Sequence, residues 1–174
     1  MPGLDKTKAI REFEPPTSIR QVREFIGLCN YFLNSIKDFF FISQHLTKLT
    51  KKDSGWSGGV LPESAYNAFQ TLKQALLTAP VLAYPDPAKN YNLLVDAAVG
   101  SEGRPGGMGA SLIQFDDPGN PHPIGYVSRG LTSFERNYTA YLLELAACVY
   151  GIEKFQVYLT GQKFTLTDIP IIGH

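Results

Sequence analysis

The feature that most constrains the fold is a change in hydrophobic period near residues 80–90. Before this point apolar residues recur at three- and four-residue spacing, which is typical of amphipathic helices. After it, short apolar runs alternate with turn-forming residues, which is typical of strands. The pattern predicts a small helical unit over residues 1–80, a linker over residues 81–90 and an α+β domain over residues 91–174.

The first part contains three helical stretches. Pro15 and Pro16 stop whatever precedes them. Thr17 or Ser18 can then cap a helix that continues through "IRQVREFIGLC". A second stretch runs through "ISQHLTKLTKK", and a third through "LPESAYNAFQTLKQALLTAP" after the Gly/Ser-rich piece "DSGWSGG".

The second part begins with three strand-like runs, "YNLLVDAAV", "GMGASLIQF" and "HPIGYVSR". Short connections rich in turn formers join them, so we expect antiparallel pairing. Thr139 can cap the long helix "AYLLELAACVYGIEKFQVYL", and "KFTLTDIPII" is a fourth strand that returns beside the first. The expected fold is therefore a mixed sheet with a helix packed on it.

Composition excludes several classes of protein. Sixteen basic and sixteen acidic residues cancel, so net charge favours neither nucleic acid nor membranes, although residues 1–52 carry a basic surplus. Cys29 and Cys148 lie in separate helical patterns, which favours reduced thiols in an intracellular protein. Neither a membrane span of roughly 18 apolar residues nor a signal core is visible in the sequence. We expect a soluble intracellular chain.

Three acids stand in apolar surroundings: Asp96 in "LLVDAAV", Glu144 in "YLLELAACV" and Asp168 at the end of "FTLTD". A buried carboxylate costs several kcal/mol unless it is hydrogen-bonded, paired or metal-bound. Each acid alone has an ordinary alternative, because an aspartate can end a strand or cap a turn and a glutamate can face solvent. If the first and fourth strands are parallel, however, the three can meet at one sheet edge, where a divalent metal would neutralise them. Oxygen ligands favour Mg²⁺ or Mn²⁺.

A family resemblance covers nearly the whole chain. The segments "IREFEPPTSIRQVREFIGLCNYF", "AFQTLKQALLTAPVLAYPD", "LLVDAA", "GGMGASLIQ" and "PIGYVSRGLTSFERNYTAYLLELAACVYGIEKFQVYLTGQKFTLTD" carry it. Together they resemble the Pol polyprotein of Ty3/gypsy-type LTR retrotransposons and related retroviruses. The similar region is the thumb and connection of the reverse transcriptase, followed by the N-terminal part of the ribonuclease H (RNase H) domain. The resemblance implies an RNase H-like sheet that is truncated at its C-terminus.

The resemblance also implies an activity. In that family the RNase H domain hydrolyses the RNA strand of an RNA–DNA hybrid with two metal ions and four acids, in the order Asp, Glu, Asp, Asp. Asp96, Glu144 and Asp168 take the first three places, with Mg²⁺ or Mn²⁺ as the expected metal. The basic residues expected to contact nucleic acid are Arg20, Arg23, Lys37 and Arg129.

Departures from the family pattern weaken the enzymatic expectation. After Asp168 the chain reads "IPIIGH" instead of the family's His-Lys-Pro-Leu, and the fourth acid is missing from the sequence. His174 could stand in for a helper histidine, but a frayed terminal residue is the favoured interpretation. The stretch "YFLNSI" replaces a family run that contains two arginines, which removes phosphate contacts. We expect weak metal binding, and weak or absent hydrolysis by this chain alone.

Two hypotheses follow. The chain is either a reverse transcriptase/RNase H fragment that acts on RNA–DNA hybrids, or a non-catalytic, co-opted or degenerate retroelement protein that acts as a binding or assembly module. A feature relevant to the second is "KFTLTDIPII", expected to be an edge strand with apolar residues at Phe164, Leu166, Ile169, Ile171 and Ile172. Such an edge recruits another strand, although Pro170 partly blunts it. We therefore expect self-association, or binding of a partner, through this strand.

Overall fold

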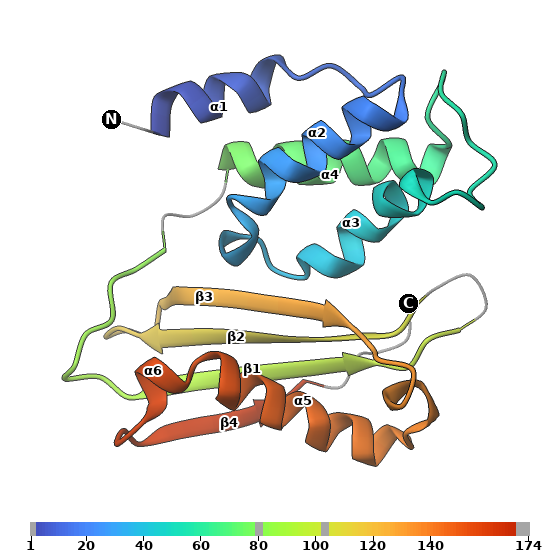
Figure 1. Ribbon diagram of the computed structural model, residues 1–174. Helices are drawn as coiled ribbons and strands as arrows, with labels where there is room; N and C mark the ends of the chain where they lie inside the picture. The colour runs from blue at the N-terminus through green and yellow to red at the C-terminus, as the bar shows by residue number, and fades with distance from the viewer. Residues whose placement is uncertain (1–2, 79–81, 102–104, 170–174) are drawn as a thin grey trace. The chain divides into compact units, whose positions relative to one another are not determined.

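The computed structural model describes residues 3–78, 82–101 and 105–169 (Figure 1). The chain divides into two compact units, Met1–Pro80 and Val81–His174. Each unit has its own cluster of buried apolar side chains. The division falls where the hydrophobic period of the sequence changes. Among the helices within the described ranges, none has the length and apolar character needed to cross a membrane.

The first unit is helical. Its helices are α1 (Gly3–Glu12), α2 (Ile19–Asn30), α3 (Phe39–Thr47) and α4 (Glu63–Thr78), with 3₁₀ turns η1 (Leu33–Ser35) and η2 (Lys48–Thr50). Of the two expected caps for α2, Ser18 is the one used, since its hydroxyl accepts the Gln21 N–H at 3.2 Å. Helix α1 was not predicted, because its mostly polar sequence has too few apolar residues to show a period.

Aromatic rings form the centre of the first unit. Phe25 and Phe69 are fully buried with ring centroids 4.6 Å apart, and Phe13 packs on Phe25 at 5.2 Å. Burying a phenylalanine side chain contributes about 1.5–3 kcal/mol. Lys73 on α4 donates to the Phe13 carbonyl at 2.8 Å, which ties the segment before α2 to α4. The predicted helical periods of α2 and α4 therefore direct Phe25 and Phe69 into one core.

The second unit is a four-stranded sheet in the order β3-β2-β1-β4. Its strands are β1 (Tyr91–Ala98), β2 (Gly107–Phe115), β3 (Pro121–Gly130) and β4 (Phe164–Asp168). Strand β2 pairs antiparallel with both β1 and β3, and β4 pairs parallel with β1. The predicted α+β fold, with three antiparallel strands, a helix and a fourth parallel strand, is confirmed.

Helices α5 (Ala140–Lys154) and α6 (Gln156–Leu159) pack on one face of the sheet (Figure 1). Thr139 caps α5 as predicted, accepting the Leu142 N–H at 3.2 Å. Helix and sheet approach most closely at Gly151, where an added Cβ would lie 3.0 Å from side-chain carbons of Ala110 and Val95. A Cβ there would be in tight contact, so the helix or these side chains would have to shift by a few tenths of an ångström.

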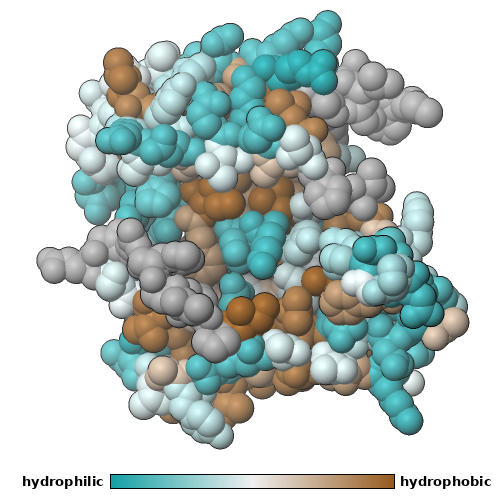
Figure 2. All heavy atoms as spheres, turned by 180° about the vertical axis from the view of Figure 1, so that it is seen from behind, coloured by the Kyte–Doolittle hydropathy of each residue, from teal (hydrophilic) through white to brown (hydrophobic). Residues whose placement is uncertain are grey.

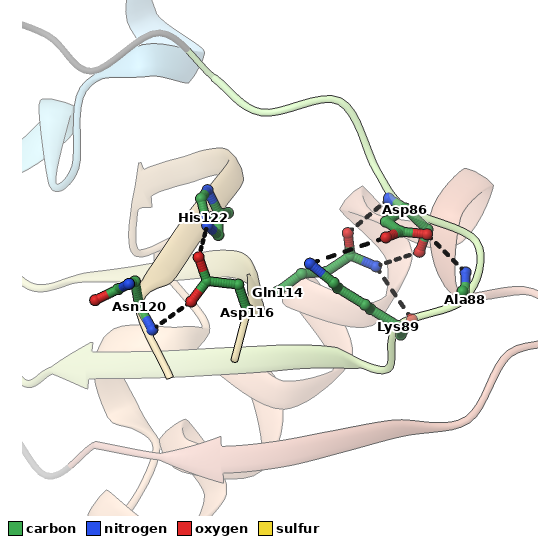
Figure 3. Close-up of polar contacts among 7 residues, drawn as sticks. All are labelled: Asp86, Ala88, Lys89, Gln114, Asp116, Asn120 and His122. Atoms are coloured by element: carbon green, nitrogen blue, oxygen red, sulfur yellow. Dashed lines mark hydrogen bonds and ion pairs between the residues drawn. The ribbon is translucent and has the colours of Figure 1, made fainter. Parts of the chain in front are cut away.

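The segment predicted as a linker is hydrogen-bonded to the sheet. Gln114 on β2, only 2% exposed, accepts the Asp86 N–H at 2.8 Å and donates to the carbonyls of Asp86 and Lys89 (Figure 3). The same view shows the β2–β3 turn, where Asp116 contacts His122 Nε2 at 2.8 Å. Residues 82–90 are therefore part of the second unit.

Strand β4 forms an edge of the sheet, as expected. Its residues from Thr165 to Asp168 are exposed, and Leu166 and Ile169 are each 41% exposed. Seen from behind, patches of apolar residues also reach the surface of the molecule between hydrophilic ones (Figure 2). The expected continuation of the strand through Pro170 and the two following isoleucines lies outside the described residues.

Candidate metal site and nucleic-acid contacts

The two aspartates lie towards the carboxyl ends of two neighbouring strands, β1 and β4. Asp96 is near the carboxyl end of β1 and Asp168 ends β4. In the parallel register Val95 is the partner of Asp168, and the Ile169 N–H donates to the Val95 carbonyl at 2.8 Å. Asp96 is therefore one residue beyond the register partner of Asp168.

That single residue matters for side-chain direction. Register partners in a sheet share a face, whereas successive residues of one strand alternate between faces. Asp168 shares the face of Val95, which packs against α5, while Asp96 belongs to the opposite face. The strand register brings the two backbones together but separates the directions of the carboxylates.

Glu144 lies in the second turn of α5 and is half-buried. Glu144 and Asp168 both lie near a third group, the half-buried Cys148. Burial raises the pKa of the Cys148 thiol first, and the negative charges of Asp168 and Glu144 raise that pKa further. Two of the three predicted acids, one on α5 and one on β4, therefore act on the same neighbour.

The three acids do not converge into a preformed metal site. Within the part of the chain that the structure describes, no group of three or more His, Cys, Asp or Glu side chains is placed to hold a metal ion. Strand alternation between Asp96 and Asp168 accounts for this arrangement. By their ligand chemistry alone, three carboxylates suit a hard divalent cation such as Mg²⁺ or Mn²⁺. The metal site at Asp96, Glu144 and Asp168 thus stays a prediction.

Three of the four predicted nucleic-acid contacts lie on the first unit, and all three are exposed. Arg20 pairs with Glu24 through Nε and Oε1 at 2.9 Å. Arg23 donates from Nη2 to the Thr50 carbonyl at 3.3 Å, which joins α2 to turn η2. Lys37 precedes α3. These cations are accessible to a phosphate backbone, with Arg20 partly compensated by its ion pair.

Arg129, the fourth predicted contact, is bound within the protein. Its Nη1 and Nη2 donate to the two carboxylate oxygens of Glu135, each at 2.7 Å. Hydrogen bonding from Arg129 lowers the pKa of Glu135 to about 2. Sequence reasoning missed this pair, although Thr132 and Glu135 have the spacing of a capping box, which signals a side chain held by local hydrogen bonds.

The first unit also has an open groove of about 390 Å³ whose lining includes Glu12, Glu14 and Glu24. Its acids are not among those predicted from the sequence. Lys8 and Arg20 offset two of the charges, since they lie 3.9 Å from Glu12 and 2.9 Å from Glu24. The groove is a second acidic location against which metal binding at the sheet edge can be tested.

The order of the strands in the sheet, the parallel pairing of β1 with β4 and the helix on one face are those of an RNase H-like domain. Residues 61–166 match the family described as the RNase H-like domain found in reverse transcriptase, and the chain belongs to this family. The match covers most of the second unit and α4 of the first. The likeness of residues 1–80 to a thumb and connection stays a prediction.

Proteins similar in sequence to this chain include the polyproteins of retrotransposons and of a retrovirus. The chain is 34% identical over 164 residues to the retrovirus-related Pol polyprotein from transposon opus of Drosophila melanogaster, covering 90% of the chain and 16% of that protein. It is 34% identical over 168 residues to the Pol polyprotein from transposon gypsy, covering 91% and 15%. With the Gag-Pol polyprotein of walleye dermal sarcoma virus it is 42% identical over 168 residues, covering 97% and 9%. The chain therefore spans only a small part of each relative.

Solved structures agree on the fold. The foamy viral protease-reverse transcriptase in complex with an RNA/DNA hybrid matches with a TM-score of 0.69 and 18% identity, covering 98% of this chain and 22% of that one. The same viral protein in complex with dsDNA gives a TM-score of 0.68 and 19% identity, covering 98% and 33%. At these identities the likeness concerns the fold alone.

Proposed function

We propose that the chain serves the hydrolysis of RNA in RNA–DNA hybrids, as part of a retroelement reverse transcriptase, by supplying Asp96, Glu144 and Asp168 as metal ligands. The observation that carries this proposal is the parallel pairing of β1 with β4, which places two of the acids on adjacent strands of an RNase H-like sheet. The negative charges of Glu144 and Asp168 both act on Cys148, which supports the inclusion of the third acid, Glu144.

Each acid has a distinct part in the proposal. Asp96 sits on β1, which is paired on both sides, so its backbone is firmly held. Asp168 is exposed on the edge strand, and Glu144 is half-buried in the second turn of α5. Bound Mg²⁺ or Mn²⁺ would supply activation of water and stabilisation of the leaving oxygen. Because the three carboxylates are not gathered beforehand, binding has to reorient them, so we expect weak affinity and weak or absent hydrolysis by this chain alone.

Nucleic-acid contact is assigned to the exposed cations of the first unit, Arg20, Arg23 and Lys37. Each would contact backbone phosphates, which contributes affinity without sequence preference. Arg129 is left out because Glu135 already engages both of its terminal nitrogens.

Binding of an RNA–DNA hybrid tests the proposal without requiring turnover. The fluorescence anisotropy of a labelled hybrid is followed with Mn²⁺ and with EDTA, for the wild type, Asp96→Asn and the control Asp53→Asn. We expect Mn²⁺ to tighten binding in the wild type and in Asp53→Asn, whose acid is an exposed residue of the first unit. Equal enhancement in Asp96→Asn, or no binding by the wild type, would refute the proposal.

The exposed edge gives the chain a second proposed property, self-association through β4. Leu166 and Ile169 present apolar surface beside a strand edge, the combination that favours pairing with another strand. A second copy of the chain is the proposed partner. This association would also give the non-catalytic alternative, an assembly module, its physical basis.

A further inference from the structure

A hydrogen bond brings together cations from two separate stretches of the first unit. Arg23 on α2 donates from Nη2 to the Thr50 carbonyl at 3.3 Å. Thr50 ends turn η2, and the next two residues are Lys51 and Lys52. All three cations are exposed. We call Arg23, Lys51 and Lys52 the basic cluster.

Hydrogen bonds fix the backbone that carries the two lysines. The Ser54 N–H donates to the Lys51 carbonyl at 3.2 Å, which closes a turn. Ser54 Oγ donates to the Leu49 carbonyl, also at 3.2 Å. Lys51 itself is extended, with φ −80° and ψ 148°, and successive side chains along extended backbone point to opposite sides. The ammonium groups of Lys51 and Lys52 are therefore directed apart and suit two separate anions better than one.

The donors of the basic cluster are largely unused inside the protein. In the ranges that the structure describes, no ion pair and no side-chain hydrogen bond engages Lys51 or Lys52. Lys73, by contrast, donates to the Phe13 carbonyl at 2.8 Å and so has a structural part. Arg23 uses Nη2 for the Thr50 carbonyl, which leaves the other donors of its guanidinium available. Packing within the unit does not account for these three charges.

The charge around the cluster favours an anionic ligand. The turn from Lys51 to Ser54 contains a single acid, Asp53, against the three cations of the cluster. Glu24 on α2 is compensated by Arg20, whose Nε lies 2.9 Å from its carboxylate. A guanidinium can bind two oxygens of one phosphate, and an ammonium binds a phosphate as a point charge. Several cations directed at separate anions match the regular phosphates of a nucleic-acid backbone.

We infer that the basic cluster binds neighbouring phosphates of a nucleic-acid duplex, with Lys51 and Lys52 as contacts beyond those predicted from the sequence. The inference rests on the proposed function, which assigns Arg23 to nucleic acid, and extends that contact to turn η2 and the residues after it. Sequence reasoning did not select the two lysines, because only the hydrogen bond from Arg23 to Thr50 joins them to α2. Phosphate contacts of this kind need no metal ion, so they can be tested apart from the acids of the second unit.

The test measures the affinity of the full chain for a fluorescently labelled RNA–DNA hybrid in EDTA, over a series of salt concentrations. The logarithm of the binding constant falls with the logarithm of the salt concentration, by about 0.9 for each phosphate contacted. We expect Lys51→Gln/Lys52→Gln to weaken binding and to reduce this slope by about 1.8. The variant Lys51→Arg/Lys52→Arg keeps both charges and should keep the wild-type slope.

The control is Lys8→Gln/Lys163→Gln, which removes the same charge from exposed positions on α1 and just before β4. It should leave the slope at the wild-type value. An equal loss of slope in the control and in Lys51→Gln/Lys52→Gln would mean that only net charge matters, and would overturn the inference. An unchanged slope in Lys51→Gln/Lys52→Gln, or no binding of the hybrid by the wild type in EDTA, would overturn it as well.

Two further outcomes separate this inference from its neighbours. Binding in EDTA that depends on Lys51 and Lys52, without any tightening by Mn²⁺, would refute the metal site of the proposed function and support the basic cluster. Competition distinguishes nucleic acid from an acidic polypeptide. We expect unlabelled DNA duplex to displace the hybrid at a much lower concentration of charge than polyglutamate does, and equal displacement by the two would overturn the assignment to nucleic acid.

Discussion

At the scale of single residues, Gly151 decides how closely α5 approaches the sheet. A methyl group there would lie 3.0 Å from carbons of Ala110 and Val95, both in the core. We predict that Gly151→Ala lowers the free energy of unfolding by about 1–3 kcal/mol through overpacking. The control is Gly27→Ala on the exposed face of α2, where an added Cβ meets nothing within 4 Å. That change should stabilise by about 0.5–1 kcal/mol, because alanine is the better helix former. Chemical denaturation measures both, and a neutral Gly151→Ala would show that α5 can shift freely.

Glu135 gives the ion pair with Arg129 a pH dependence. Its pKa in the folded protein is lowered from 4.5 to about 2 by the hydrogen bonds from Arg129. A carboxyl whose folded pKa is depressed contributes stability above its unfolded pKa, and that contribution is lost as pH falls through the folded value. We predict that the stability difference between wild type and Glu135→Gln is constant above about pH 5 and shrinks from pH 4.5 towards pH 2. Urea titrations at several pH values test this, and a difference that does not change over that window would mean that the ion pair does not form.

At the scale of elements, the exposed edge of β4 is the feature with the clearest consequence. We predict concentration-dependent self-association of the chain at tens of micromolar, and its loss in Leu166→Lys, because a lysine on an edge strand discourages pairing. Leu166 is 41% exposed, so the substitution should cost little stability. Sedimentation velocity reports the outcome, with Val60→Lys as the control, an exchange of an apolar residue for lysine at a 92% exposed position of the first unit, away from β4. A wild-type chain that stays monomeric would show that the edge is already protected.

How much of the structure could be predicted from the sequence differs from one element to the next. Caps and periods are local, so a cap at Thr17 or Ser18, the cap at Thr139 and the strand β2 were predictable from a few neighbouring residues. Helix α1 was missed because its mostly polar sequence shows no period, and its buried residue Ile10 becomes evident only from the contact of α1 with α4. The sheet edge that carries Asp96 and Asp168 was predictable from chain order. The one-residue offset that directs their side chains to opposite faces depends on register, which the sequence does not state.

At the scale of the whole molecule, two separate cores predict two cooperative units. Phe69 is fully buried in the first core, and its replacement by alanine should cost about 3–5 kcal/mol there. We predict that Phe69→Ala accelerates hydrogen exchange in α2 and α4 while the slow amides of β1 and β2 keep their wild-type rates. Leu112→Ala, in the core of the second unit, is the reciprocal variant. Equal acceleration in both units by either change would mean that the chain unfolds as a single unit.

The central claim is that Asp96, Glu144 and Asp168 form the metal site of an RNase H-like domain. The most direct measurement is the broadening of backbone amide NMR signals by substoichiometric Mn²⁺, because a paramagnetic ion marks the residues around it. We predict selective broadening at the carboxyl ends of β1 and β4 and in the first turns of α5, lost in Asp96→Asn and kept in Asp53→Asn. Broadening centred instead on the groove of Glu12, Glu14 and Glu24, or unchanged in Asp96→Asn, would contradict the claim.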